Sequence, residues 1–251
     1  MNTALLEDRP AQDGPGDIGD FARFDVHSWP SLGLAAHLCS FSVSQFDQKL
    51  YTLHGIEFDA SLSGAVRKRR AEFLAGRICA ARALEHLAAS KVVPTGEDRS
   101  PIWPAGLIGS ITHCDETAMA IALRKDNPRG VEGVGIDLER RTACRDASLG
   151  LRHFATGAER DVLVHAGIAC EDHAVIAFSM KESFFKAAYP YVRRYFSFSA
   201  VSIVDVDSRH NRLSLVVAQD IGGKLKKGLR VEGEYANLGH TFVSTIVTIN
   251  Y

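Results

Sequence analysis

The stretch "VEGVGIDLERR", residues 131–141, places two acids inside an apolar run. Asp137 and Glu139 are separated by one leucine, and the apolar run around them predicts a buried β-strand. Because successive side chains of a strand point to opposite faces, both carboxylates lie on the same face. Such a pair is repulsive unless a cation or water lies between the two groups. The pattern indicates either a strand end that runs into solvent or an oxygen-rich site for a cation.

A second charged motif follows about forty residues later. The segment "FSMKESFFKAAY" places Lys181, Glu182 and Lys186 inside an aromatic helical pattern. Glu182 and Lys186 are four residues apart, so an ion pair on an exposed helix face is one interpretation. If Glu182 instead meets Asp137 and Glu139, three carboxylates form an all-oxygen site that suits Mg²⁺ or Mn²⁺ and not zinc. The lysines would then be partners of phosphate oxygens.

Helical and strand-like patterns surround these motifs on both sides. Apolar residues recur at steps of three and four in "SGAVRKRRAEFLAGRICAARALEHLAAS", which predicts a helix, whereas "LIGSITHC" and "TAMAIALR" predict a strand pair. After a break at residues 127–130, the second half again combines helical patterns with β-branched strands. We predict an α+β fold with subdomains 21–128 and 129–251, preceded by an N-terminal arm at residues 1–20.

The first helix and the strand after it carry a second set of polar candidates. Arg70 and Arg77 are seven residues apart and so lie on nearly the same helix face. With Arg69 they form either a solvated basic face or an anion clamp, since arginine binds phosphate through a rigid fork. In "PIWPAGLIGSITHC", Ser110 and His113 follow an irregular loop. His113 is interpreted as a core histidine or as a hydrogen-bond donor to phosphate. A Ser–His nucleophile is disfavoured, because no nucleophile elbow surrounds Ser110.

Bulk composition excludes several classes of protein. The chain has 251 residues, 46% of them hydrophobic and 24% charged, with a formal net charge of −1, which excludes a nucleic-acid-binding polycation. No uncharged apolar run approaches the roughly 18 residues of a membrane span, and the acidic N-terminus is unlike a signal peptide. The five cysteines include no C-x-x-C pair. We interpret them as reduced thiols and expect a cytoplasmic protein.

Four of these blocks together resemble a known family. In order and spacing, "RKRRAEFLAGRICAARAL", "PIWPAGLIGSITHC", "GIDLE" and "FSMKESFFKA" resemble the signatures of the Sfp-type 4′-phosphopantetheinyl transferases, in the enterobactin-synthase-component-D-like branch. The resemblance covers about residues 67–188. It implies two similar α/β subdomains related by pseudo-twofold symmetry. It also implies transfer of the phosphopantetheine arm of coenzyme A onto a serine of an apo carrier protein, with release of adenosine 3′,5′-bisphosphate.

The resemblance also implies roles for individual residues. Mg²⁺, for which Mn²⁺ can substitute, is expected at an acidic site, and the coenzyme A phosphates are expected at basic and hydroxyl side chains. The base that accepts the serine proton is either Glu182 or a metal-bound water. In full, the implied metal ligands are Asp137, Glu139 and Glu182; the catalytic residues are Glu182, Lys181 and Lys186; and the coenzyme A contacts are Arg69, Arg70, Arg77, Arg99, Ser110, His113, Lys181 and Lys186.

Other functions fit some of the same residues. One alternative is a non-catalytic module that binds coenzyme A or docks a carrier protein, and another is a Mg²⁺-dependent phosphotransferase for a different nucleotide. Three acids beside phosphates argue against simple binding, because phosphate sites favour cations and backbone N–H groups. The implied partners are coenzyme A and carrier-protein domains of fatty-acid, polyketide or siderophore synthases. We expect no nucleic-acid or membrane partner, and a monomer, because the two halves supply both walls of the site.

Overall fold

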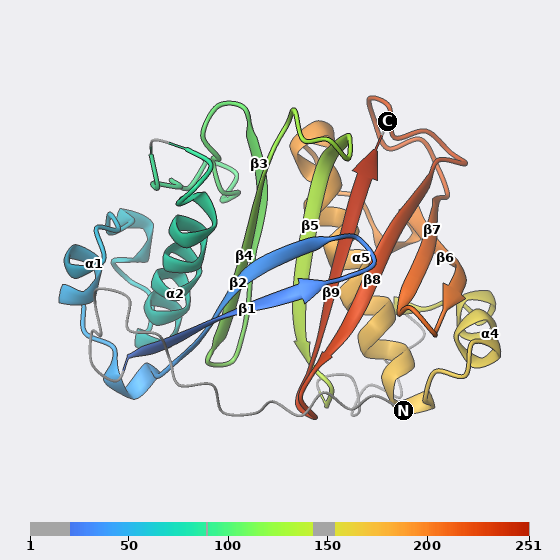
Figure 1. Ribbon diagram of the computed structural model, residues 1–251, viewed down its shortest axis with the longest axis horizontal. Helices are drawn as coiled ribbons and strands as arrows, with labels where there is room; N and C mark the ends of the chain where they lie inside the picture. Colours follow the sequence, from blue (N-terminus) through green and yellow to red (C-terminus); the bar gives the residue numbers. More distant parts are fainter. Residues whose placement is uncertain (1–20, 89, 143–153, 251) are drawn as a thin grey trace.

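The computed structural model describes residues 21–88, 90–142 and 154–250, so the predicted arm at residues 1–20 lies outside the described residues. Two antiparallel sheets stand beside each other, and one long helix packs on each (Figure 1). The predicted α+β class is confirmed. None of the helices in the described ranges is both long enough and apolar enough to span a membrane.

The first sheet is built from two hairpins that are separated in sequence by a helix. Its strands lie in the order β1-β2-β4-β3, and the small and apolar face of α2 packs against it around Leu74, Ile78 and Cys79. The expected helix begins at Arg67 and ends at Leu84, inside the segment that the periodicity indicated. The elements are β1 (Ala22–Trp29), β2 (Leu34–Phe41), α1 (Lys49–Leu53), α2 (Arg67–Leu84), β3 (Leu107–Cys114) and β4 (Thr117–Arg124).

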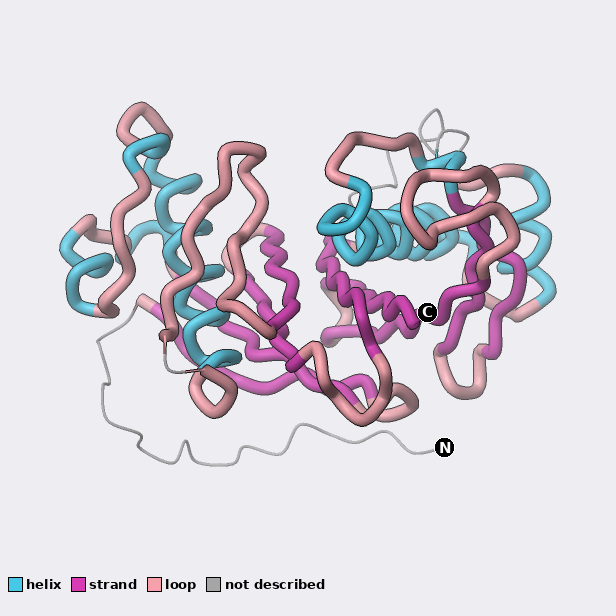
Figure 2. The backbone as a smooth tube through the Cα atoms, turned by 90° about the horizontal axis from the view of Figure 1, so that it is seen from above, coloured by secondary structure: helices cyan, strands magenta, loops and turns pink. Residues whose placement is uncertain are grey.

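The second sheet has the order β5-β9-β8-β7-β6, and α5 lies along β5 and β9. Figure 2 shows α5 on one side of these strands, seen from above. Its apolar side chains, Met180 and Phe184 among them, fill the core between helix and sheet. The elements are β5 (Val131–Arg140), α4 (Gly157–His165), α5 (His173–Val192), β6 (Val201–Asp207), β7 (Arg212–Val217), β8 (Arg230–Leu238) and β9 (Phe242–Asn250).

Glycines allow α5 to lie unusually close to β5. A Cβ atom on Gly135 would overlap the backbone oxygen of Ser183, and one on Gly133 would lie 2.7 Å from the oxygen of Ala187. Ser183 is also tied to β9, because its Oγ lies 2.7 Å from Thr245 Oγ1. The glycines in "VEGVGID" therefore bring the helix backbone onto the strand, directly before the acids of that strand.

The two sheets meet where β3 lies beside β5. Apolar residues of both sheets form one core here, including Ile108, Ile121 and Ile136. The β1–β2 hairpin crosses from the first sheet toward β8 and β9 (Figure 1), where His27 Nε2 lies 2.9 Å from Ser244 Oγ. The loop at residues 125–130 connects β4 of the first sheet to β5 of the second. This connection supports the division into subdomains 21–128 and 129–251, which we keep as a proposal.

Candidate active site

The centre of the site lies where α5 crosses the seam between β3 and β5. Lys186 Nζ on α5 lies 2.6 Å from Asp137 Oδ1, 3.1 Å from the Ile136 oxygen and 3.2 Å from Thr112 Oγ1. The Thr112 hydroxyl donates to the same Asp137 oxygen at 3.2 Å. Asp137 is only 4% exposed, whereas Lys186 is partly exposed. Three elements thus place one lysine beside one buried carboxylate.

The predicted acidic residues lie in one neighbourhood. Burial, followed by the charges of Asp137 and Glu182, raises the pKa of Glu139 to about 7. Burial and the charge of Asp137 also raise the pKa of Glu182. The second oxygen of Asp137, Oδ2, is buried and has no hydrogen-bond partner. These carboxylates therefore repel one another and could accept a further cation.

The three acids do not form a ready ligand set in this structure. Within residues 21–88, 90–142 and 154–250, no three His, Cys, Asp or Glu side chains are gathered so that they could hold a metal ion. Lys186 is instead the cation in contact with Asp137. The fit to a divalent metal is thus partial: the unpartnered Asp137 oxygen and the mutual repulsion favour it, and the contact of Lys186 with Asp137 does not.

A second cluster joins α2 to the end of β3. Arg69 Nη1 donates to His113 Nε2 at 2.8 Å, and Glu72 Oε2 lies 3.8 Å from both Arg69 Nη1 and His113 Nδ1. Burial, followed by the charges of Arg69 and Lys186, lowers the pKa of His113 to about 4. His113 is therefore neutral at pH 7, with Nε2 as an acceptor. Sequence reasoning missed Glu72, although its spacing from Lys68 and Arg69 was the available signal.

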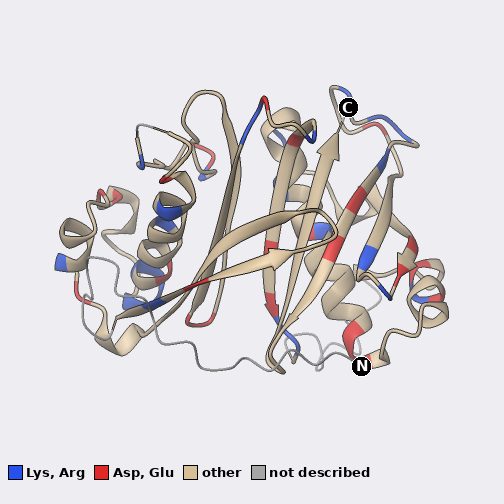
Figure 3. Cartoon of the chain, in the orientation of Figure 1, with Lys and Arg blue, Asp and Glu red and all other residues tan. Residues whose placement is uncertain are grey.

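The other two arginines of α2 do not join the cluster around His113. Arg70 Nε donates to the Leu62 oxygen at 3.0 Å, and its guanidinium holds the segment before the helix. Arg77 Nη2 donates to Thr95 Oγ1 at 3.0 Å. Arg77 is 8% exposed, its Nε has no partner, and burial lowers its pKa to about 10. The arginines of α2, the helix that carries several basic residues in Figure 3, therefore contact different parts of the protein.

Lys181 is also separated from the centre of the site. Its Nζ lies 2.8 Å from Glu159 Oε1, and both side chains are at most 3% exposed. The expectation that Lys181 lies beside phosphates together with Lys186 does not match this position, because its amine is enclosed by α4 and α5. Glu159 was also missed, although "TGAE" at residues 156–159 is a readable capping-box signal, and both of its hydrogen bonds are formed.

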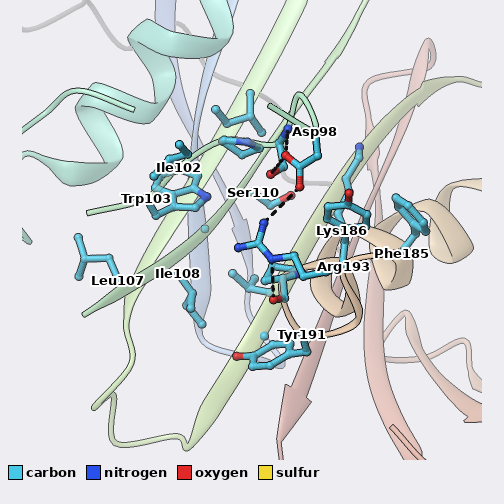
Figure 4. A pocket seen from close by; sticks show the side chains of 18 of the residues that line it. Asp98, Ile102, Trp103, Leu107, Ile108, Ser110, Phe185, Lys186, Tyr191 and Arg193 are labelled. Carbon is cyan, nitrogen blue, oxygen red and sulfur yellow. Dashed lines mark hydrogen bonds and ion pairs between the residues drawn. The ribbon is translucent and has the colours of Figure 1, made fainter. Parts of the chain in front are cut away.

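A cleft of about 670 Å³ leads to the centre of the site between β3 and the C-terminal half of α5 (Figure 4). Trp103, Ser110 and Lys186 line it, and Arg99 belongs to the loop at its edge. Ser110 Oγ accepts from the backbone N–H of Ile136 at 3.1 Å. At the mouth of the cleft, Arg193 lies 3.2 Å from Asp98, so the two halves of the chain contact each other there.

Two family models match the chain. Residues 58–123 match the model of the 4′-phosphopantetheinyl transferase N-terminal domain, and residues 133–236 match that of the 4′-phosphopantetheinyl transferase superfamily. The matched ranges contain the Arg69–His113 cluster and the Lys186–Asp137 pair, respectively. The chain belongs to the 4′-phosphopantetheinyl transferase family, as its sequence motifs predicted.

Named relatives place the chain within this family. It is 37% identical over 153 residues to enterobactin synthase component D of Escherichia coli O157:H7. The aligned segment covers 55% of this chain and 71% of that protein. The protein of the same name from Salmonella typhi is 33% identical over 189 residues, 75% of this chain and 76% of the relative. The 4′-phosphopantetheinyl transferase PptT of Mycobacterium tuberculosis is 32% identical over 143 residues, 57% of this chain and 61% of the relative.

Proposed function

We propose that the cleft between β3 and α5 binds coenzyme A, and that the protein transfers its phosphopantetheine arm onto a serine of an apo carrier protein. The observation that carries this proposal is the Lys186–Asp137–Thr112 contact at the cleft, built from residues of the family's own motifs. A cleft of about 670 Å³ is in the range of cofactor pockets.

The reaction forms one phosphorus–oxygen bond and breaks another. The serine oxygen attacks the β-phosphorus of the coenzyme A diphosphate, and the P–O bond to the bridging oxygen breaks. Adenosine 3′,5′-bisphosphate leaves with that electron pair, and the serine proton passes to a base. Negative charge grows on the phosphate oxygens as the bonds change, so a fixed cation close to them lowers the barrier. Lys186 is the candidate, because it is partly exposed at the cleft.

We propose Asp137, Glu139 and Glu182 as the residues that hold Mg²⁺ when coenzyme A is present. The unpartnered Oδ2 of Asp137 and the raised pKa values of Glu139 and Glu182 support this assignment. A bound divalent cation would neutralise the diphosphate and align it for attack. Glu182 is then also the candidate protein base for the serine proton, and the alternative base is a water molecule that Mg²⁺ would activate when bound.

We propose that the 3′-phosphate of coenzyme A binds near Arg69 and His113. Arg69 is half exposed, so its guanidinium can turn toward an anion, and it lies beside His113. Arg99 and Ser110 line the cleft and are kept as nearer contacts of coenzyme A. Arg70 and Arg77 are weaker candidates, because their hydrogen-bond partners lie away from His113 and Arg77 is also buried.

The decisive experiment is a mass measurement on the carrier. The protein is mixed with coenzyme A, Mg²⁺ and apo carrier domains from siderophore, polyketide and fatty-acid synthases. A gain of one phosphopantetheine group supports transfer, and binding of coenzyme A with no gain on any carrier would support the non-catalytic module. Replacing Mg²⁺ by Mn²⁺ and then by EDTA tests the metal requirement.

The names of the relatives suggest which carrier to try first. Two of them are enterobactin synthase components, so we propose a siderophore-synthase carrier domain as the first substrate. We also propose that the protein acts as a monomer, since both walls of the cleft come from one chain. We propose a cytoplasmic location from the reduced cysteines that the sequence indicates. Light scattering of the active protein checks the oligomeric state.

A further inference from the structure

Two lysines of α5 lie only five residues apart and have very different surroundings. Lys186 lines the cleft, whereas Lys181 is 3% exposed and contacts both oxygens of Glu159, at 2.8 and 3.0 Å. The Glu159 side chain is 2% exposed. A phosphate oxygen could reach Lys181 only if this ion pair were broken.

Glu159 connects three elements through its one carboxylate. Its Oε2 accepts from the Thr156 backbone N–H at 2.8 Å, at the start of α4. Its Oε1 accepts from the Ile203 backbone N–H at 3.0 Å, on β6. With Lys181 of α5, both oxygens are fully used. Buried charges are stable only when they are paired and hydrogen-bonded in this way.

Lys181 and the two residues of α5 at the centre of the site, Glu182 and Lys186, point to different sides of the helix. Neighbouring residues of an α-helix point about 100° apart, so Lys181 and Glu182 face different sides. With Lys181 held against α4 and β6, Glu182 lies close enough to Asp137 for the aspartate charge to raise the pKa of Glu182. A turn later, Lys186 contacts Asp137 directly.

We infer that Lys181 and Glu159 form an anchor that holds α5 in the rotation that presents Glu182 and Lys186 to the cleft. Lys181 is a positioning residue and does not touch the phosphates. This inference rests on the proposed function, because the anchor matters for transfer only if the Asp137 region is the active site.

The test compares a single substitution with a paired one. Lys181→Met leaves the Glu159 carboxylate buried without a counter-charge. Lys181→Met/Glu159→Gln removes both charges and keeps an amide oxygen as acceptor for one of the two backbone N–H groups. If Lys181 is an anchor, the paired substitution should restore part of the kcat and Tm that the single substitution lowers. If Lys181 acts on the phosphate, the second substitution changes nothing in the chemistry.

Transfer to an apo carrier is measured at a temperature where circular dichroism shows each variant to be folded. We expect Lys181→Met to lower kcat by about 100-fold, the scale of a small displacement of catalytic groups, with the KM for coenzyme A changed less than about threefold. The paired variant should recover at least about tenfold of that loss and have a higher Tm than Lys181→Met. Lys186→Met is the matched control: we expect its loss of turnover to persist when Glu159→Gln is added.

Each result decides between the roles. A folded Lys181→Met protein with unchanged kcat would show that the pair supports stability alone. A paired variant with restored Tm and no recovery of kcat would show that Lys181 acts on the substrate. If the wild type transfers nothing to any carrier, the proposed function fails, and the coupling of the two substitutions in Tm still reports on the ion pair.

Discussion

The two long helices hold their charged residues in contrasting ways. On α2, Arg69 and Lys68 are at least half exposed, and Glu72 balances them at 3.8 Å. On α5, Lys181 and its partner Glu159 are almost completely buried, and Lys186 contacts a buried aspartate. Arg69 and Lys68 of α2 can adjust to a ligand, whereas the α5 charges have fixed positions. Recognition of a phosphate at the surface tolerates the first arrangement, and chemistry at a phosphorus atom requires the second.

The two helices also differ in what an added methyl group would meet where helix and strand pack together. α5 packs on Gly133 and Gly135, where added Cβ atoms would meet helix backbone. The one glycine of α2, Gly76, faces the Cγ2 methyl of Ile111, which would lie 2.9 Å from an added Cβ atom. A methyl group can move, but a hydrogen-bonded helix backbone moves only as a unit. The geometry of α5 should therefore be far less tolerant of change.

The largest combined effect, on stability and turnover together, is expected from Gly135→Ala. The new methyl group would overlap the Ser183 oxygen, so α5 must shift away from β5. We expect the free energy of unfolding to fall by about 3 kcal/mol and turnover to fall by about 100-fold. Thermal melts and transfer assays measure both quantities.

Gly76→Ala on α2 is the matched control for this substitution. It should change stability by less than about 1 kcal/mol, since alanine favours a helix and only the Ile111 methyl must move. Equal losses of unfolding free energy in Gly135→Ala and Gly76→Ala would contradict the proposal that the packing of α5 tolerates less change than that of α2.

Asp137→Asn should have the next largest effect, on turnover more than on stability. It removes the charge that Lys186 contacts at 2.6 Å and one proposed metal ligand. We expect kcat to fall by roughly 100- to 1000-fold, the cost of losing preorganised charge at a reacting group. Steady-state transfer rates at several Mg²⁺ concentrations measure this effect. A folded variant with near-normal Mg²⁺-dependent turnover would show that the acids are only a strand end.

Arg69→Ala should act on binding of coenzyme A. Loss of a charged hydrogen bond costs about 1.5–3 kcal/mol, which corresponds to a rise of roughly 10- to 150-fold in the KM for coenzyme A. Dephospho-coenzyme A, which lacks the 3′-phosphate, should be nearly unaffected. Arg82→Ala is the control on the same helix, because the Arg82 guanidinium lies over the Phe24 ring, 3.7 Å from its centroid, and Arg82 is not a proposed contact of coenzyme A. Equal losses with both donors would contradict the 3′-phosphate assignment.

The smallest expected effect is a pH dependence of stability. The pKa of Glu139 is raised from 4.5 to about 7 in the folded protein, so the folded state keeps this proton at a higher pH than the unfolded state does. This contribution is fully present below about pH 4.5 and is lost as the pH rises through 7. In EDTA, the decline of Tm between pH 5 and 7.5 should be shallower for Glu139→Gln than for the wild type. Identical slopes would contradict the raised pKa.

The sequence predicted most regular elements, and the misses have physical causes. The strands at residues 107–114 and 117–124 were confirmed, because alternation and β-branched residues are local signals. β1 (Ala22–Trp29) and β8 (Arg230–Leu238) were not predicted. β1 is an edge strand with exposed charged residues, and β8 carries Glu232, Gly233 and Glu234, so neither shows a clean apolar pattern.

Residue types and spacing alone determined the family, the α+β class and the group of charged residues from which the site is built. Only the tertiary structure showed that Arg69 and Arg70 have different partners, and that Lys186 lies at the cleft while Lys181 is buried. Only the tertiary structure showed that Glu72 and Glu159 are partners of these charged residues. Spacing along a helix fixes the direction of a side chain relative to its neighbours on that helix. The surface that the helix meets decides which direction is the cleft and which is the core, and that surface comes from strands more than twenty residues away in sequence.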